Sequence, residues 1–307
     1  MCEENSFFRA DFSSIEGYER SLEPFRAYAR EVMALPPPKA GEDSSIRIEQ
    51  AGEDQYARIY RVWIEVIEGV EVYGLYMVPK NLRGKAPLII AVHGGGGCPE
   101  AICDLDTREN YHSFGPEAVK RGYLVWAPFT AMTVGYGGDP ETEITRQSLT
   151  RKARWIDLTM DGIDVYKIQA GARALMVTRP EIDSERIGMT GLSYGGYFTL
   201  RVMAVSPWIQ VGVVSGMFRD TGDDLHPAAR GFGQIQAAAL ICPRPLMLQN
   251  GENDTVVPVE RARIGAPKVA AFYEKLGIGD RFMFTVHPGS HEFHIESMFD
   301  FFEKHLR

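Results

Sequence analysis

The spacing of hydrophobic and polar residues differs from one part of the chain to the next, and each kind of spacing predicts a different secondary structure. In Gly17–Leu35 the apolar positions follow helical spacing, and the prolines at 36–38 end that helix. The segments Arg58–Glu68 and Val70–Val78 instead alternate from residue to residue, with a Glu68-Gly69 turn between them. This pattern predicts an antiparallel β-hairpin.

From Pro87 onward, short apolar segments alternate with segments of helical periodicity. The apolar segments are 88–92, 123–127, 187–190, 211–214, 246–249 and 282–286. The helical segments are 115–121, 157–178, 195–205, 259–276 and 292–305. Continuously apolar strands are typical of a parallel sheet with helices on both faces. The sequence therefore predicts an α/β fold with a mostly parallel, doubly wound sheet, and the hairpin is its antiparallel edge.

This organisation predicts a single domain. Residues 1–80 are expected to supply an N-terminal helix and edge strands that are integral to it, and residues 81–307 to form the core. Two stretches, near 129–156 and 219–239, interrupt the alternation, and each follows the end of a predicted strand. Such sheets bind ligands at the carboxyl ends of their strands. We predict that both stretches are loop insertions that roof a pocket.

Composition narrows the possible partners. The chain has 307 residues, 45% of them hydrophobic, and a net charge of −8, so no basic surface is available for nucleic acid or anionic lipid. No apolar run reaches the ~20 residues that a bilayer requires. The N-terminus lacks the features of a secretory signal, and the four cysteines are sparse. A cytoplasmic location is expected, whereas the oligomeric state is not predicted.

The strongest motif is Gly191-Leu192-Ser193-Tyr194-Gly195, which matches the pattern G-x-S-x-G. It lies between a predicted strand and a predicted helix, where a sharp turn would expose a serine hydroxyl. Glycines two residues on either side of the serine remove side chains that would collide with the neighbouring elements. Ser193 is therefore the predicted nucleophile.

A run of glycines, Gly94–Gly97, follows His93 at the end of the strand 88–92. Backbone N–H groups in such a loop can converge on a developing oxyanion. We expect the oxyanion hole to combine the N–H of Tyr194 with that of Gly94 or Gly95. A phosphate cradle is the alternative, but the loop lacks the Lys-Ser/Thr of a P-loop. His93 is interpreted as a packing and hydrogen-bonding residue.

A catalytic histidine needs a carboxylate that fixes its tautomer and orientation. Asp254 follows the predicted strand 246–249 and is the preferred candidate. Glu252 is a weaker candidate because it lies closer to the strand end. The main rivals follow the preceding strand and are Asp220, Asp223 and Asp224.

Three histidines follow the last predicted strand. His291 comes after a Gly-Ser turn, in a loop that can reach Ser193, and it is the predicted base. His287 lies at the strand end and His294 at the start of a helix. Together these histidines could suggest zinc, but their spacing without a nearby cysteine is a weak signature. We therefore predict no metal site.

The order Ser193, Asp254, His291 resembles the order of the α/β-hydrolase superfamily, over about Pro87 to the C-terminus. The nucleophile motif with Gly196, the segment 251–254 and the segment 289–293 are similar to the dienelactone-hydrolase-like branch, which includes acetyl-xylan-esterase-like and prolyl-oligopeptidase-type enzymes. Dienelactone hydrolases proper carry cysteine where this chain has Ser193. Prolyl-oligopeptidase relatives have a long propeller domain, for which roughly eighty residues are too few.

These features predict a serine carboxylesterase that needs no cofactor and acts on a small ester; the resemblance favours a carbohydrate-linked one. The enzymatic alternative is an exo-acting peptidase or amidase. A non-catalytic, hydrolase-like binding protein is the alternative from another class, although such proteins usually lose one of the three catalytic residues. The residues expected to line the substrate pocket are Met132, Tyr136, Trp155, Tyr194, Phe218 and His226.

Overall fold

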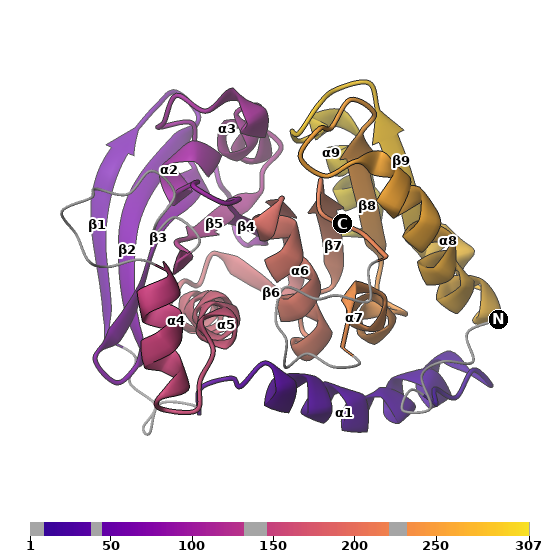
Figure 1. The fold of residues 1–307 in the computed structure, drawn as a ribbon. Coiled ribbons are helices and arrows are strands. Elements are labelled where there is room, and N and C mark those ends of the chain that lie inside the picture. The colour runs from indigo at the N-terminus through magenta and orange to yellow at the C-terminus, as the bar shows by residue number, and fades with distance from the viewer. Residues whose placement is uncertain (1–8, 38–44, 132–145, 221–231, 307) are drawn as a thin grey trace.

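One large sheet organises the molecule. The computed structural model describes residues 9–37, 45–131, 146–220 and 232–306 (Figure 1). Within these ranges the sheet has nine strands, in the order β1-β2-β3-β5-β4-β6-β7-β8-β9. The strands are β1 (Ile46–Glu53), β2 (Ala57–Ile67), β3 (Val70–Pro79), β4 (Ala86–Val92), β5 (Leu124–Pro128), β6 (Ile182–Leu192), β7 (Val211–Ser215), β8 (Leu246–Gly251) and β9 (Phe282–His287).

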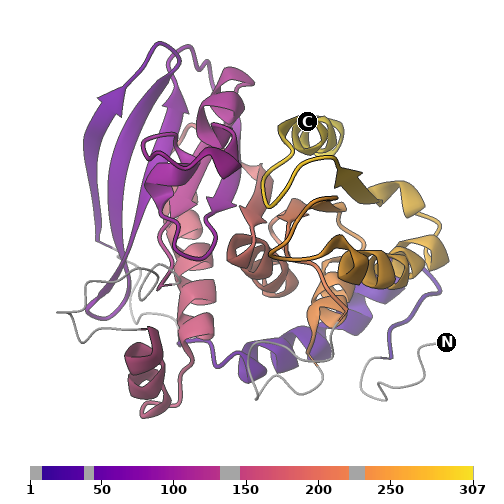
Figure 2. The same cartoon turned by 45° about the horizontal axis from the view of Figure 1, so that its top comes forward.

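Helices cover both faces of this sheet. They are α1 (Ile15–Val32), α2 (Pro99–Ile102), α3 (Phe114–Lys120), α4 (Arg146–Arg154), α5 (Met160–Thr178), α6 (Tyr194–Val205), α7 (Gln234–Ile241), α8 (Val259–Lys275) and α9 (Ile295–His305), with 3₁₀ helices η1 (Glu109–Tyr111) and η3 (Gly279–Arg281). Helices α5–α8 pack on one face, and α2, α3 and α9 pack on the other (Figure 2). No helix in the described ranges is both long and apolar enough to cross a bilayer.

The sheet has the predicted mixture of strand directions. The pairs β5–β4, β4–β6, β6–β7, β7–β8 and β8–β9 are parallel. The hairpin β2–β3 is antiparallel, and β3 joins the core by an antiparallel pairing with β5. In β4, Ile89 and Ile90 are fully buried on opposite faces, which explains why this strand is continuously apolar. The predicted doubly wound sheet with an antiparallel edge is confirmed.

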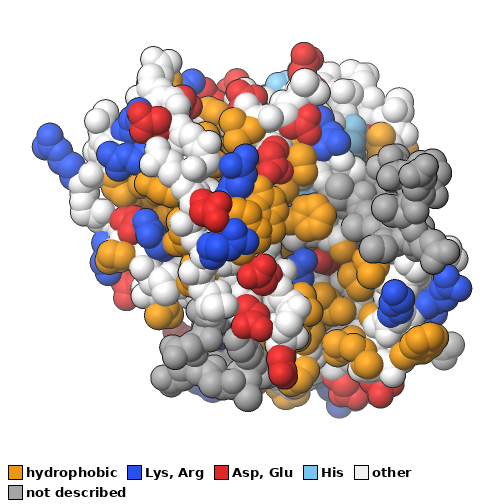
Figure 3. Space-filling view, turned by 90° about the vertical axis from the view of Figure 1, so that its left-hand side faces the viewer, with side chains coloured by type: hydrophobic (Ala, Val, Ile, Leu, Met, Phe, Trp, Pro, Cys, Tyr) orange, Lys and Arg blue, Asp and Glu red, His pale blue; other side chains and the backbone are white. Residues whose placement is uncertain are grey.

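The outermost strand, β1, was not predicted from the hydrophobic pattern. Ile46 and Ile48 are only partly buried against the core, so the strand has a weak alternation. Arg47 pairs with Glu49 at 2.8 Å and stacks over the Trp63 ring at 3.7 Å. Figure 3 views the molecule from this side, where charged side chains of both signs lie among hydrophobic ones. Charges on an edge strand oppose pairing with another sheet.

Parts of the two predicted insertions are helical. Residues 146–154 form α4, and residues 234–241 form α7, which packs against α6 and α8 as a regular layer element. The prediction of a loop through Ala239 is therefore wrong, because Ala237, Ala238 and Leu240 are apolar and fill the core between neighbouring helices. Within the two predicted insertions, residues 132–145 and 221–231 lie outside the described residues.

Helix α1 begins at the Ser14 cap and runs across α6 and α7 along the bottom of Figure 1. Its buried positions, Tyr18, Leu22 and Ala29, belong to the same core cluster as the helices beneath it. The Tyr18 hydroxyl donates to the carbonyl of Ala239 at 2.8 Å. Helix α1 is thus bound to α7 and packs on the helical layer of the core.

Candidate active site

Ser193 lies at the sharp turn between β6 and α6, as the motif predicted. Its backbone has φ 58° and ψ −121°, a strained conformation for a residue with a side chain. The Ser193 N–H donates to the carbonyl of Ser215 at the end of β7, at 2.8 Å. This bond holds the strained turn at the carboxyl edge of the sheet.

The glycines of the motif are required by close backbone contacts. A Cβ on Gly195 would lie 2.0 Å from the carbonyl oxygen of Val92 in β4. A Cβ on Gly191 would lie 2.2 Å from the carbonyl carbon of Gly195. Neither position has space for a side chain, so the strand, the turn and the helix can approach one another only with these glycines.

The glycine loop after β4 packs directly against Ser193. A Cβ on Gly94 would lie 3.2 Å from the Ser193 Cβ, and the loop closes through a bond from the Gly97 N–H to the Gly94 carbonyl at 3.1 Å. The Gly94 N–H already donates to the Tyr111 hydroxyl at 2.9 Å. Of the two loop donors considered, Gly95, which is exposed at the tip, is therefore the one left for an oxyanion.

The second predicted donor is the N–H of Tyr194, the first residue of α6. An N–H at the start of a helix lies at the positive end of the helix dipole, which favours a developing negative charge. This N–H directly follows Ser193, so it and Gly95 come from the two loops that meet at the serine.

His93 has a structural role at the base of the glycine loop. Its side chain is fully buried, with Nδ1 at 2.9 Å from the Gly94 carbonyl and Nε2 accepting from the Thr130 N–H at 3.0 Å. Burial lowers the pKa of His93 to about 4, so the ring is neutral. Both ring nitrogens are occupied, which agrees with the interpretation of His93 as a packing and hydrogen-bonding residue.

Asp254 and His291 form a hydrogen-bonded pair. The Nδ1 of His291 lies 2.8 Å from Oδ2 of Asp254, whose side chain is fully buried. The other carboxylate oxygen accepts the N–H groups of Val256 and Val257, each at 2.8 Å. Burial alone would raise the pKa of Asp254, but the bonds from His291 and these N–H groups outweigh it and lower the pKa. Asp254 is therefore held as an anion.

The His291 ring lies next to the serine turn. A Cβ on Gly216 would lie 3.2 Å from both Nδ1 and Cε1 of His291, and Gly216 follows Ser215, which binds the Ser193 N–H. With Nδ1 bound to Asp254, the Nε2 atom is left to exchange a proton with a nucleophile. The carboxyl ends of β6, β7, β8 and β9 thus place Ser193 and the Asp254–His291 pair at the same edge of the sheet.

The rival carboxylates have other partners. Glu252 forms an ion pair with Arg263 at 2.5 Å and is about half exposed. Asp220 pairs with Lys268 of α8. Asp223 and Asp224 lie outside the described residues. Among the described candidates, only Asp254 contacts His291.

The two flanking histidines bond to other groups. His287 is buried, and its Nδ1 accepts the Gly289 N–H at 3.2 Å. The Nδ1 of His294 lies 2.8 Å from the Ser297 hydroxyl. Within the described ranges, no group of three or more histidine, cysteine, aspartate or glutamate side chains is placed to hold a metal ion.

Two of the residues predicted to line the pocket have other surroundings in the structure. Phe218 is only 2% exposed, and a Cβ on Gly265 of α8 would lie 2.8 Å from its ring, so it belongs to the core. Trp155 is 84% exposed on the surface after α4. An aromatic residue in an irregular segment can pack inward or outward, and no periodicity around Phe218 or Trp155 decides between the two. Met132, Tyr136 and His226 lie outside the described residues.

The sequence does not mark residues 110–112 as part of the site, yet this segment contacts both the glycine loop and the loop that carries His291. Tyr111 receives the Gly94 N–H, the Asn110 carbonyl receives the N–H of Phe293 at 3.0 Å, and His112 binds Glu292 at 2.9 Å. No motif or periodicity marks these residues. The only signal in the sequence is an aromatic side chain in a short polar stretch, which is not specific.

Comparison with curated proteins finds distant relatives, and no protein-family model matches the chain. YtaP of Bacillus subtilis, which carries the provisional name of a hydrolase, is 26% identical over 77% of this chain and 82% of its own length. YuxL of Bacillus subtilis, named as an uncharacterized peptidase, is 27% identical over 64% of this chain. That match covers 30% of YuxL, so the chain spans under a third of that relative.

Solved structures of esterases share the fold. A methylesterase superposes with a TM-score of 0.72 at 18% identity, covering 95% of this chain and 65% of its own. A glucuronoyl esterase from Solibacter usitatus gives 0.65 at 14% identity, covering 97% and 98%. Acetyl xylan esterase 1 from Thermoanaerobacterium gives 0.59 at 17%, covering 92% and 93%. The chain has the α/β-hydrolase fold.

Proposed function

We propose that the protein is a serine carboxylesterase that acts through an acyl-enzyme. The observation that carries this proposal is the Asp254–His291 pair at 2.8 Å, placed beside the strained turn that presents Ser193. A histidine that is oriented by a buried carboxylate and lies next to a serine on a sharp strand–helix turn is the arrangement that activates a hydroxyl nucleophile.

In the proposed mechanism, Ser193 attacks the ester carbonyl while Nε2 of His291 takes the hydroxyl proton. Asp254 holds Nδ1–H of the ring and stabilises the imidazolium that forms. The N–H groups of Tyr194 and Gly95 receive the oxyanion of the tetrahedral intermediate. The alcohol leaves with the proton from His291, and water, activated by the same nitrogen, then hydrolyses the acyl-enzyme.

For the substrate, we propose a small or carbohydrate-linked ester. Support comes from the structural neighbours, whose names describe acetyl xylan, glucuronoyl and methyl esterases, although at 14–18% identity they share the fold alone. The net charge of −8 gives no reason to expect a polyanionic substrate. Ester recognition would depend on the segments after β5 and β7, where α/β sheets bind their ligands.

A labelling experiment tests the nucleophile. Wild type and Ser193→Ala are treated with a fluorophosphonate probe and assayed on p-nitrophenyl acetate. We expect labelling of wild type only, and a decrease in kcat of about 10⁴-fold or more in the variant, because triad residues act as a unit. Equal labelling of both proteins would contradict the proposal.

A substrate panel tests the ester class. Nitrophenyl esters of increasing acyl length are compared with acetylated sugars, feruloylated sugars and sugar methyl esters. We expect the highest kcat/KM on short acyl groups, and turnover of at least one sugar ester. An enzyme that hydrolyses only long-chain esters would overturn the carbohydrate assignment while leaving the serine mechanism intact.

A peptidase or amidase is the second candidate, favoured by the name of the relative YuxL and by the Tyr194-Gly195-Gly196-Tyr197 continuation of the motif. Ser193, Asp254 and His291 could also act on an amide: Ser193 would be acylated by the amide carbonyl, and His291 would protonate the leaving amine. Turnover of an aminoacyl-anilide in preference to the nitrophenyl ester would decide for it.

A further inference from the structure

One short segment, residues 110–112, contacts both loops that serve Ser193. We infer that this segment is a brace that sets the oxyanion loop and the catalytic histidine loop relative to each other, with Tyr111 as its main positioning residue. The inference rests on the proposed function, because it assigns a role in the same reaction.

The first contact is with the oxyanion loop. Tyr111 is 2% exposed, and its hydroxyl receives the Gly94 N–H at 2.9 Å. A Cβ on Gly97 would lie 2.8 Å from this oxygen, so the hydroxyl fills the inner side of the turn formed by Gly94–Gly97. Because the Gly94 N–H is held on this side, the following peptide is fixed and the Gly95 N–H stays available to an oxyanion.

The second contact is with the loop that carries His291. The Asn110 carbonyl receives the Phe293 N–H at 3.0 Å, and the Tyr111 and Phe293 rings meet edge to face at 5.6 Å. His112 Nε2 lies 2.9 Å from Oε2 of Glu292, whose other oxygen accepts the Ser290 N–H at 2.9 Å. The two neighbours of His291 in the chain are therefore both tied, through Glu292, to His112.

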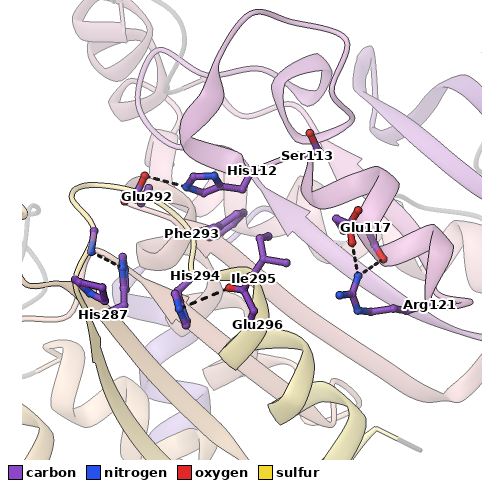
Figure 4. Close-up of a pocket in the computed structure, with 12 residues that line it drawn as sticks. His112, Ser113, Glu117, Arg121, His287, Glu292, Phe293, His294, Ile295 and Glu296 are labelled. Atoms are coloured by element: carbon purple, nitrogen blue, oxygen red, sulfur yellow. Dashed lines mark hydrogen bonds and ion pairs between the residues drawn. The ribbon is translucent and has the colours of Figure 1, made fainter.

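The His112–Glu292 tie lies at the edge of an open pocket, whereas Phe293 on the inner side of the loop is buried. A cavity of about 480 Å³ lies between the start of α3 and the loop, and His112, Glu292 and Phe293 are among its lining residues. Figure 4 shows His112 and Glu292 pointing toward each other across one side of it. On this side of the loop, the hydrogen bonds of Glu292 to His112 and to the Ser290 N–H are the contacts that hold its position.

The backbone of the segment is consistent with a conformation imposed by these contacts. His112 has φ 47° and Ser113 has φ 52°, two consecutive left-handed residues that are not glycine. Such conformations cost on the order of 1–3 kcal/mol each and persist only where the surrounding contacts determine them. None of the contacts of residues 110–112 described above involves the Ser193 side chain, so their effect on catalysis would be indirect.

The test compares two substitutions, each of which removes the hydroxyl oxygen of a buried tyrosine. Tyr111→Phe removes the acceptor of the Gly94 N–H and keeps the ring against Phe293. Tyr18→Phe is the matched control, because its hydroxyl is equally buried and bonds the Ala239 carbonyl far from the site. For each variant, kcat and KM on p-nitrophenyl acetate, the rate of fluorophosphonate labelling and the melting temperature are measured.

We expect Tyr111→Phe to lower kcat and the labelling rate by about 10- to 100-fold with KM nearly unchanged, because oxyanion contacts act in the transition state. The control should lose similar melting temperature but keep kcat within about 2-fold. If Tyr111→Phe does not fold, His112→Asn takes its place, since asparagine tolerates the left-handed conformation. We expect it to lower kcat by about 3- to 10-fold.

Two failures can be told apart. A kcat within about 2-fold of wild type in the folded variant, with labelling still dependent on Ser193, would overturn the brace alone. Labelling that persists in Ser193→Ala would overturn the proposed function, and the brace with it.

Discussion

The two sides of Ser193 are held by different kinds of bonds. On the acid–base side, the loops after β8 and β9 bind each other through the main chain: the Glu252 N–H donates to the His287 carbonyl at 2.7 Å, and the Asn253 N–H to the Gly289 carbonyl at 3.0 Å. On the oxyanion side, the glycine loop is held by two buried side chains, Tyr111 and His93.

This difference determines which substitutions each side tolerates. Bonds between backbone groups survive most side-chain changes, whereas a bond to a buried hydroxyl or imidazole disappears with its residue and leaves an unpaired polar group. We therefore expect the acid–base side to depend strongly on its catalytic residues and only weakly on other side chains such as His112 and Glu292, because the main-chain bonds between its loops remain when those side chains change. The oxyanion side should also depend on residues that take no part in the chemistry.

The largest expected effect is on the acid–base side. Asp254→Asn should lower kcat by about 10⁴-fold, because the amide would favour the wrong tautomer of His291. Asp220→Asn is the matched control, since Asp220 pairs with Lys268 and should change kcat by less than about 2-fold. The measurement is kcat on p-nitrophenyl acetate. The reverse ranking would move the catalytic acid to the end of β7.

The next effect concerns the oxyanion side and is a loss of folding stability at low pH. The folded pKa of His93, about 4, lies below the ordinary histidine value of about 6.5. The unfolded chain therefore binds more protons between these values, so the stabilisation is complete above pH ~6.5 and decreases as the pH falls toward 4. We expect His93 to account for a loss of about 2–3 kcal/mol in the free energy of unfolding between pH 7.5 and 4.5.

Urea unfolding of wild type and His93→Gln at both pH values measures this loss. Glutamine keeps an acceptor for the Thr130 N–H but does not titrate in this range. Comparing the two proteins cancels the contribution of every other titrating group. An identical pH dependence in both would mean that His93 is not the buried neutral group that the structure indicates.

The smallest expected effect sharpens the comparison. The exposed Asn253 side chain donates to the Pro288 carbonyl at 2.7 Å, parallel to the backbone bonds that already join these loops. Asn253→Ala should therefore lower kcat by less than about 3-fold and the melting temperature only slightly. A decrease above about 10-fold would show that the acid–base side also relies on non-catalytic side chains, and the distinction between the two sides would be lost.

The predictable parts of the molecule are those in which the cause is local. The glycines around Ser193 are needed by contacts within one strand–turn–helix unit, and the apolar strands of the parallel sheet are buried on both faces. Asp254 and His291 were predicted because each follows a recognisable strand. Their hydrogen bond adds geometry that the sequence could only suggest.

The parts that were missed depend on contacts between distant or irregular segments. Tyr111 meets Gly94 across 17 positions without any periodic pattern, and the tie between His112 and Glu292 spans 180 positions. Phe218 was assigned to the pocket, but it packs into the core under α8. Each of these positions depends on which side chain fills a given space in the folded molecule. The pattern of residue types along the chain does not contain that information.

The bond from Tyr18 to Ala239 joins positions 221 residues apart. During synthesis, the apolar face of the first helix therefore has no α7 to cover it until that later helix has left the ribosome. At the usual 5–20 residues per second this interval is roughly 10–45 s. Although α6 also covers part of α1, the contact with α7 forms only after this interval, and until then the side of α1 that faces α7 is exposed to chaperones and to other nascent chains.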